Sequence, residues 1–447
     1  MLNASAVATR SSTNRKKGMK PPKAHNSLHP SVYVQASLAP RVGGLGIASA
    51  VRESPGAFLA ASIASFRFIR DHFGRLVPQG RLSASAPDRL SYVAAATRAL
   101  ALYQQQAQLP PGASLDALLS ASPSSVSQHT FAEKVHHQAV RALLDALPDD
   151  YNAKHRARLV SCGGAHAGAW LSAIPVDQHT TVLTPAFRRA LHLRLGVPLR
   201  ELASGHVRCA CGEVVDPYGF HYGSGCRRGN RGNAWGARHE MANDALISGF
   251  RGLGVRGAHA VSQNYLGEAA LTGRGIGYKR PDGRLRGYHS LDRHVYWDTA
   301  VADPAGLTAL RSGSALVAGA GVAARRRCAA KDAKYRDLVE GAGSQWVAAV
   351  VERFGAVSGP LQGLFKQVAG EGERDPLRDD GWTFSASSRV TFLAQRFVLA
   401  AVIGDALMVE SLCARDAFGS APPGVRRLGP VRGPVGSGYC FDEASDS

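Results

Sequence analysis

Apolar residues recur at helical spacing through the first half of the chain. Residues 43 to about 199 are rich in Ala, Leu and Arg, and one stretch shows the helical pattern clearly. This stretch carries Ala57, Leu59, Ala60, Ile63 and Phe66. Pro and Ser residues between 109 and 125 interrupt the pattern and separate neighbouring helices. The pattern predicts a mostly helical region without a block of strands.

The pattern becomes mixed after residue 233. A helix is expected from Ala237 to Leu253, and a strand around Ala258 to Gln263. The run HVYWDTAVAD alternates cleanly, with one face formed by Val295, Trp297, Thr299 and Val301. A long Ala-rich helix is expected over about 315–340, and further helices over 343–415. The chain is therefore predicted to be α+β, with one small α/β domain among helices.

These changes of pattern divide the chain into six expected parts. They are a disordered basic arm (1–42), a helical region (43–204), a Cys/His-rich segment (205–232), an α/β domain (233–342), a helical extension (343–418) and a disordered tail (419–447). The best apolar run, Phe397–Val409, is too short to span a membrane and contains Asp405. No membrane association is expected.

Charge adds an argument about partners. The 447 residues carry a formal net charge of +19, and the pI is about 10.0. Each Lys or Arg that neutralises a phosphate releases a counterion, so this excess favours DNA or RNA as a partner. A merely alkaline protein is the alternative.

The cysteines and the amino terminus bear on the compartment. Only three of the seven cysteines cluster, which is not a disulfide framework and favours a reducing compartment. Residues 1–40 lack the apolar core of a secretory signal. The basic stretch RSSTNRKKGMKPPK is typical of a nuclear address or of a solvated tail. A nuclear location is expected, with the cytoplasm as the alternative.

The segment RCACGEVVDPYGFHYGSGC has the composition of a zinc site. One residue separates Cys209 from Cys211, nine residues follow to His221, and four more to Cys226. Three thiolates and an imidazole suit tetrahedral Zn²⁺, and a closed site of this kind is structural. Four glycines allow tight turns in so short a loop. The alternative is a Cys/Gly-rich loop without metal.

Two carboxylates and one lysine form a second candidate site. Asp282 follows Pro281 at a turn, and fifteen residues separate it from Asp298 in the YWDTAV strand. Carboxylates near the ends of adjacent strands suit Mg²⁺, which activates water for hydrolysis; a common Pro-Asp turn is the alternative. Lys331 lies in the apolar stripe of the next helix, where a charge needs a partner, unless it snorkels from the edge. Lys334 lies on a more polar face.

The ordered series AGAWLSAIPV…LHLRLGVPL…CACG…DPYGFH…C…RHE…KRPDG…YWDTAVAD…AAKDAKYRDL resembles the C-terminal part of site-specific non-LTR retrotransposon proteins. In that family a CCHC zinc knuckle precedes a restriction-like endonuclease of the PD-(D/E)XK type. The resemblance implies knuckle ligands at Cys209, Cys211, His221 and Cys226. It also implies metal-binding acids at Asp282 and Asp298, and a catalytic lysine at Lys331.

The resemblance also assigns a basic pair, Arg238 and His239, to the DNA backbone. Gln263 and Asn264 stand where the family often has Glu-Pro, so Glu240 is the expected substitute in catalysis. The chain contains no YADD-like polymerase box, and residues 43–200 resemble only the thumb and linker that follow a polymerase palm. Reverse transcriptase activity is therefore not expected.

Two hypotheses follow for the chain as a domesticated or truncated remnant of such an element. The first is a Mg²⁺-dependent DNA endonuclease that uses Asp282, Asp298 and Lys331. The second is a catalytically inactive nucleic-acid-binding remnant. Both hypotheses use a set of basic residues near the acids to contact phosphates. The set is Arg274, Lys279, Arg280, Arg284, Arg286, Arg325, Arg326, Arg327 and Lys334.

Overall fold

The computed structural model confirms the predicted mixed α+β class: the chain is mostly helical and contains a small four-stranded mixed sheet. The structure describes residues 28–73, 91–109, 114–147, 152–202, 207–209, 211–226, 234–255, 257–261, 281–286, 294–306, 309–310, 319–371 and 386–417. The statements below concern these residues.

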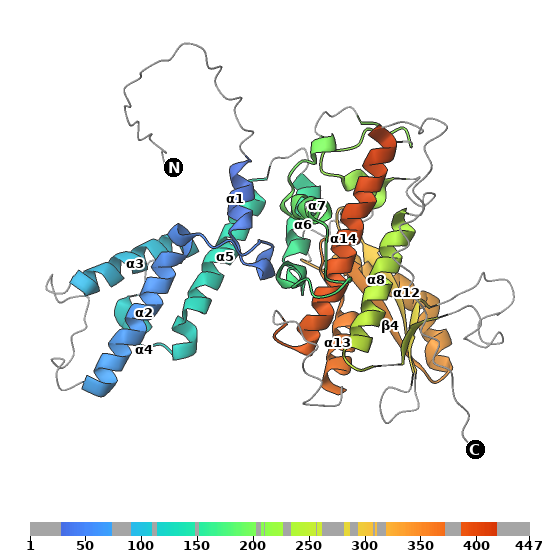
Figure 1. The fold of residues 1–447 in the computed structure, drawn as a ribbon. Helices are drawn as coiled ribbons and strands as arrows, with labels where there is room; N and C mark the ends of the chain where they lie inside the picture. The colour runs from blue at the N-terminus through green and yellow to red at the C-terminus, as the bar shows by residue number, and fades with distance from the viewer. Residues whose placement is uncertain are drawn as a thin grey trace, which may run out of the picture.

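Helices near the amino terminus form a lobe with its own apolar core, on the left in Figure 1. Its elements are α2 (Ala50–Phe73), α3 (Ser91–Ala107), α4 (Leu115–Ser120), η2 (Pro123–Val126) and α5 (Gln128–Asp145). Leu59, Ile63 and Phe66 of α2 lie in the same core as Tyr103 and Phe131. The helical stripe predicted from these α2 residues is confirmed.

The first described elements are α1 (Pro30–Ala36) and η1 (Pro40–Val42). The His29 side chain caps α1, and Val32 and Gln35 are buried. The prediction of a disordered arm through residue 42 is therefore wrong for these two elements, because α1 buries side chains against the rest of the protein. Residues 1–27 lie outside the described part.

Buried arginines join these first elements to the next segment. That segment contains α6 (Asn152–Cys162), η4 (Ala169–Ser172), α7 (Thr184–Leu195) and η5 (Arg200–Leu202). The Arg194 guanidinium donates to the carbonyl oxygens of Pro40 and Gly44 at 3.0 and 3.2 Å. Arg158 donates to the Gln35 side chain at 3.1 Å. The guanidinium groups therefore connect α7 and α6 to the first elements through buried hydrogen bonds.

A four-stranded sheet with the order β1-β2-β3-β4 forms the centre of the second half. The strands are β1 (Ala258–Ala260), β2 (Gly283–Leu285), β3 (Val295–Ala302) and β4 (Gln345–Glu352). β1, β2 and β3 are antiparallel neighbours, whereas β3 and β4 run parallel. Helix α12 (Val322–Gly341) connects the parallel pair, as such a pair requires a crossover.

Helices cover both faces of this sheet (Figure 1). Val295 and Trp297 share a core with α8 (Ala234–Gly252), α13 (Gly359–Glu371) and α14 (Arg389–Ala417). Tyr296 and Ala300 point to the other core, which contains Cys328 and Tyr335 of α12. The alternation predicted for this strand is confirmed, and it places Asp298 on the α12 side.

Strand β4 corrects the prediction that helices fill residues 343–415. The run QWVAAVVE is almost continuously apolar because the strand is buried on both faces, and such a run lacks the alternation that marks a half-exposed strand. The sheet thus extends past the boundary expected at residue 342. Helix α14 packs on α8 in the same core, so the C-terminal helices are part of the α/β body.

Helix α14 is the one described helix that is long and apolar enough to cross a membrane. Of its most apolar window, 94% is buried inside the protein. This burial is typical of a central core helix, and the predicted apolar run Phe397–Val409 lies within it.

Candidate metal centres

The segment around the first two cysteines forms a tight hairpin. The Cys209 amide donates to the Glu213 carbonyl at 2.9 Å, and the Gly212 amide donates to the Cys209 carbonyl at 2.8 Å. Gly212 has a φ of +93°, which a residue with a Cβ rarely adopts. The hairpin turns the side chains of Cys209 and Cys211 towards one point.

Asp216 shapes the second half of the same loop. Its carboxylate accepts hydrogen bonds from the amides of Tyr218 and Phe220 at 3.0 Å and from the amide of His221 at 2.7 Å. A wide helical turn, η6 (His221–Gly225), follows and leads to Cys226. The Asp216 carboxylate therefore positions His221 and Cys226 close to Cys209 and Cys211.

The four side chains converge as a closed group. The sulfurs of Cys209 and Cys226 are 3.3 Å apart, and the Cys211 sulfur lies 3.4 Å from His221 Nε2. All four ligand atoms lie within 4.8 Å of one another, and the cysteines are not in disulfides. His221 Nδ1 lies 3.3 Å from the Glu213 carboxylate, which directs Nε2 towards the sulfurs. This group could bind a metal such as zinc.

The second group forms where α8, the sheet and α12 meet. Asp282 directly precedes β2, Asp298 lies in β3, Lys331 lies on α12 and His239 lies on α8. His239 Nε2 is 2.8 Å from Asp282 Oδ2, and Lys331 forms an ion pair with Asp298. Ligand atoms of His239, Asp282 and Asp298 lie within 4.8 Å of one another. The sequence-predicted Asp282, Asp298 and Lys331 are therefore brought together.

Asn243 fixes the helix that carries His239, one turn further along α8. Its Oδ1 accepts hydrogen bonds from Trp297 Nε1 at 2.9 Å and from the Thr299 hydroxyl at 3.1 Å. Its Nδ2 donates to the Asp282 carbonyl at 3.4 Å. One buried amide thus ties α8 to β3 and to the turn before β2, and this sets the position of His239.

The two carboxyl groups have opposite pKa shifts. Burial opposes the charge on Asp282, but hydrogen bonds from His239, Asp298 and the Thr299 amide lower its pKa to about 2. Burial, together with the hydrogen bond to Asp282 and its charge, raises the pKa of Asp298 to about 7, although Lys331 acts in the opposite direction. The hydrogen bond to Asp282 raises the pKa of His239. Carboxylates held this close repel each other, and a divalent cation would relieve that repulsion.

Two other predicted site residues lie outside this group, and two more fall outside the part of the chain that the structure describes. Arg238 is buried and donates to Asp405 at 2.7 Å, so the expectation that it contacts DNA is corrected: its guanidinium is used inside the protein. Glu240 is exposed and does not belong to the metal-binding group. Lys279 and Arg280 lie outside the described residues.

The remaining basic candidates differ in exposure. Lys334 is exposed and lies over the Tyr335 ring, with its Nζ 2.6 Å from the hydroxyl. Arg284 is buried and donates to His259 at 3.0 Å, so it is not an exposed phosphate contact. Arg286 and the run Arg325–Arg327 are exposed, at β2 and at the start of α12. These four arginines therefore lie at the surface of the protein.

Sequence reasoning placed His239 on the DNA backbone and missed its contact with Asp282. The signal was present, since His239 lies three positions before Ala242 and seven before Leu246, which places it on the apolar face of that helix. A polar residue on a buried stripe needs a partner, as Lys331 does. The same rule applied to His239 indicates an inward contact.

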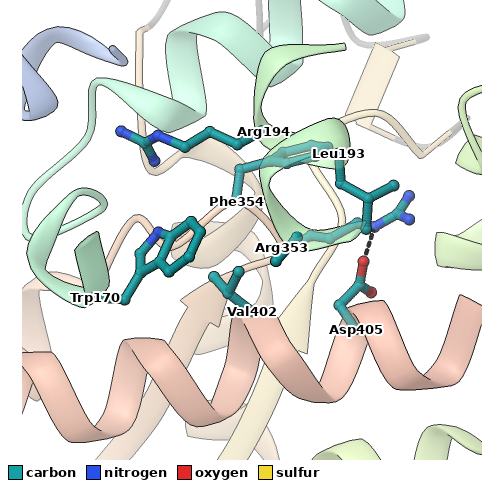
Figure 2. Close-up of a pocket in the computed structure, with 8 residues that line it drawn as sticks. Trp170, Leu193, Arg194, Arg353, Phe354, Val402 and Asp405 are labelled. Carbon is teal, nitrogen blue, oxygen red and sulfur yellow. Dashed lines mark hydrogen bonds and ion pairs between the residues drawn. The ribbon is translucent and has the colours of Figure 1, made fainter. Parts of the chain in front are cut away.

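A small cavity lies apart from both groups, between α7 and α14 (Figure 2). Figure 2 shows Arg353 beside Asp405, whose carboxylate accepts a hydrogen bond from Arg353 Nε at 2.6 Å. The volume is about 10 Å³, room for one water at most. It is therefore a packing gap beside a buried ion pair and not a substrate site.

No protein-family model matches this chain, and a search of the curated proteins returns no match.

Proposed function

We propose that the protein is a metal-dependent DNA endonuclease related to the C-terminal part of non-LTR retrotransposon proteins. The observation that carries this proposal is the convergence of Asp282, Asp298 and Lys331 from three separate elements, with carboxylate oxygens within 4.8 Å. A divalent cation such as Mg²⁺ in this group would lower the pKa of a water and stabilise charge on a phosphate. Zn²⁺ in the Cys/His group would hold the fold.

The chain's own residues have distinct roles in this proposal. The Thr299 amide donates to Asp282 Oδ2 at 2.6 Å and holds this carboxylate in place, and His239 Nε2 lies 2.8 Å from the same oxygen. Lys331 neutralises part of the acidic charge and places an ammonium where a phosphate oxygen would approach. The exposed Arg286 and Arg325–Arg327 would bind the flanking DNA backbone. A DNA substrate agrees with a nuclear location.

A plasmid assay tests the proposal. The purified chain should nick supercoiled DNA with Mg²⁺ or Mn²⁺, and Asp282→Asn and Asp298→Asn should each reduce the rate by at least about 100-fold. Asp337→Asn is the matched control, because this exposed acid of α12 lies outside the group. Its nicking rate should equal that of the native chain.

The same assay, together with a DNA-binding measurement, distinguishes the nuclease from an inactive nucleic-acid-binding remnant. DNA binding by fluorescence anisotropy, with no nicking by the native chain under either cation, would support an inactive nucleic-acid-binding remnant. Nicking that survives in both Asn variants would exclude this group as the catalytic site. A chain that neither binds nor nicks DNA would refute both hypotheses.

A further inference from the structure

We propose that His239 is a third protein ligand of the cation at the Asp282/Asp298 group, so that this site favours Mn²⁺ over Mg²⁺. The inference deepens the proposed nuclease function, on which its biological meaning rests. It changes the expected cation chemistry, because the sequence had predicted an all-carboxylate Mg²⁺ site.

The distances fit one shared ion. Around an octahedral cation with bonds of about 2.1 Å, neighbouring ligand atoms lie about 3.0 Å apart and opposite ones about 4.2 Å apart. His239 Nε2 and Asp282 Oδ2 are 2.8 Å apart, and no pair in the group with Asp298 exceeds 4.8 Å. For all three atoms to bind one ion, the longest of these distances has to shorten by no more than about 0.6 Å.

The donor set decides which ion is preferred. Mg²⁺ is bound by carboxylates, phosphates and water, and it takes imidazole poorly. First-row transition dications accept imidazole readily, and Mn²⁺ also accepts carboxylates. One imidazole with two carboxylates therefore favours Mn²⁺ over Mg²⁺ more strongly than two carboxylates do.

The surroundings hold the imidazole in place and leave it accessible. Arg238, the preceding residue, is fixed by Asp405, and Asn243 fixes the next turn of α8. The His239 side chain itself is 37% exposed, whereas the side chain of Asp298 is only 5% exposed. Helix α8 is thus held in place before and after His239. The ring itself is partly exposed to solvent, so a hydrated ion can reach it.

His239 could instead only orient Asp282 through its hydrogen bond. His239→Gln separates the two roles, because the Gln amide can still donate to Asp282 but supplies no imidazole nitrogen. Asp244→Asn is the matched control, an exposed acid on the same helix outside the group. Both positions are partly or fully exposed on one helix, so neither change should unfold the protein.

The test measures binding of the metal alone to the full chain without DNA, after one equivalent of zinc has filled the Cys/His group. Pulsed electron paramagnetic resonance of bound Mn²⁺ should show coupling to an imidazole nitrogen in the native chain and in Asp244→Asn. His239→Gln should lose this coupling. The ratio of the Mg²⁺ to the Mn²⁺ dissociation constant, from calorimetry, should fall about tenfold or more in His239→Gln.

The outcomes distinguish this inference from the proposed function. Mn²⁺ without nitrogen coupling in the native chain, or an unchanged dissociation-constant ratio in His239→Gln, overturns the ligand role even if the chain nicks DNA. Nitrogen coupling in a chain that never nicks DNA supports the ligand role and refutes the nuclease function.

Discussion

The two candidate metal centres differ in how the chain builds them. The Cys/His group draws all four ligands from one loop of eighteen residues, and three of the four are buried. The second group draws His239, Asp282 and Asp298 from α8, the turn before β2 and β3, with Lys331 added from α12. A closed local site holds structure, whereas an open site assembled over long range can accept a substrate.

The two centres share one supporting core. Cys209, Cys226 and Tyr222 pack in the same apolar cluster as α8 and α14. Arg353 donates to the Gly219 carbonyl in the Cys/His loop (residues 209–226) and to Asp405 on α14. Asp405 also accepts from Arg238, which precedes His239. The local centre is therefore part of the framework that positions the long-range one.

The largest effect should come from removal of one knuckle ligand. Cys226→Ser should abolish zinc binding and reduce the free energy of unfolding by about 5 kcal/mol or more, because structural zinc contributes on the order of 10 kcal/mol in small zinc domains. Zinc content by mass spectrometry and thermal unfolding measure the effect. Nicking should fall as well, since the knuckle packs in the core that supports α8.

Cys328→Ser controls for loss of a buried thiol. This residue lies in the α12 core and outside the knuckle. The Cys328→Ser variant should retain full zinc content, and its free energy of unfolding should fall by only about 1 to 2 kcal/mol. If Cys226→Ser unfolds at the same temperature as the native chain, the knuckle is not a structural metal site.

The next effect should come from the ion pair that connects the two centres. Asp405→Asn removes the carboxylate from the buried Arg238 and leaves the buried Arg353 with only its longer pair to Asp303 at 3.8 Å, which should reduce the free energy of unfolding by about 3 to 5 kcal/mol. Urea unfolding measures this loss. Glu340→Gln is the control, since its pair with Arg336 is about half exposed and should contribute no more than about 1 kcal/mol. Equal losses in the two variants would contradict the connecting role of Asp405.

The sequence predicted that Cys209, Cys211, His221 and Cys226 cluster, and it predicted the second group without the contact of His239. The difference has a physical reason. The four Cys/His side chains share one loop whose turns are set by nearby Gly212 and Asp216, so spacing alone indicates convergence. Asp282 and Asp298 were predictable because their strands are close in sequence. Lys331 was predictable because a charge in an apolar stripe requires a partner.

Residues whose partners are far away in sequence were misread. Arg238 looked like a surface charge because its partner Asp405 lies 167 residues later. His239 was assigned to the DNA backbone because its contact with Asp282 depends on how α8 docks on the sheet. Strand β4 was read as helix because an apolar run buried on both faces has no alternation. In each case the deciding contact is tertiary.

The smallest expected effect is a pH dependence of stability that comes from His155, which packs against the Cys/His loop. Burial, with the charges of Arg158 and Lys154, lowers the pKa of His155 to about 3. Its ring packs edge-on against Tyr218 and Phe220 of the knuckle loop, at 4.4 and 5.1 Å between centroids. The folded state therefore keeps this ring neutral at pH values where the unfolded chain, with a pKa of about 6.5, takes up a proton.

The sign follows from proton binding. Below about pH 6.5 the unfolded state binds more protons at His155 than the folded state, so stability falls as pH falls, by at most about 1.4 kcal/mol per pH unit. Urea unfolding of the native chain and of His155→Phe should diverge by about 2 kcal/mol between pH 7 and pH 5. Acid release of zinc affects both proteins alike and cancels in the difference. Parallel pH profiles would mean that His155 is protonated in the folded protein and that the contact between α6 and the knuckle loop is looser than its ring packing indicates.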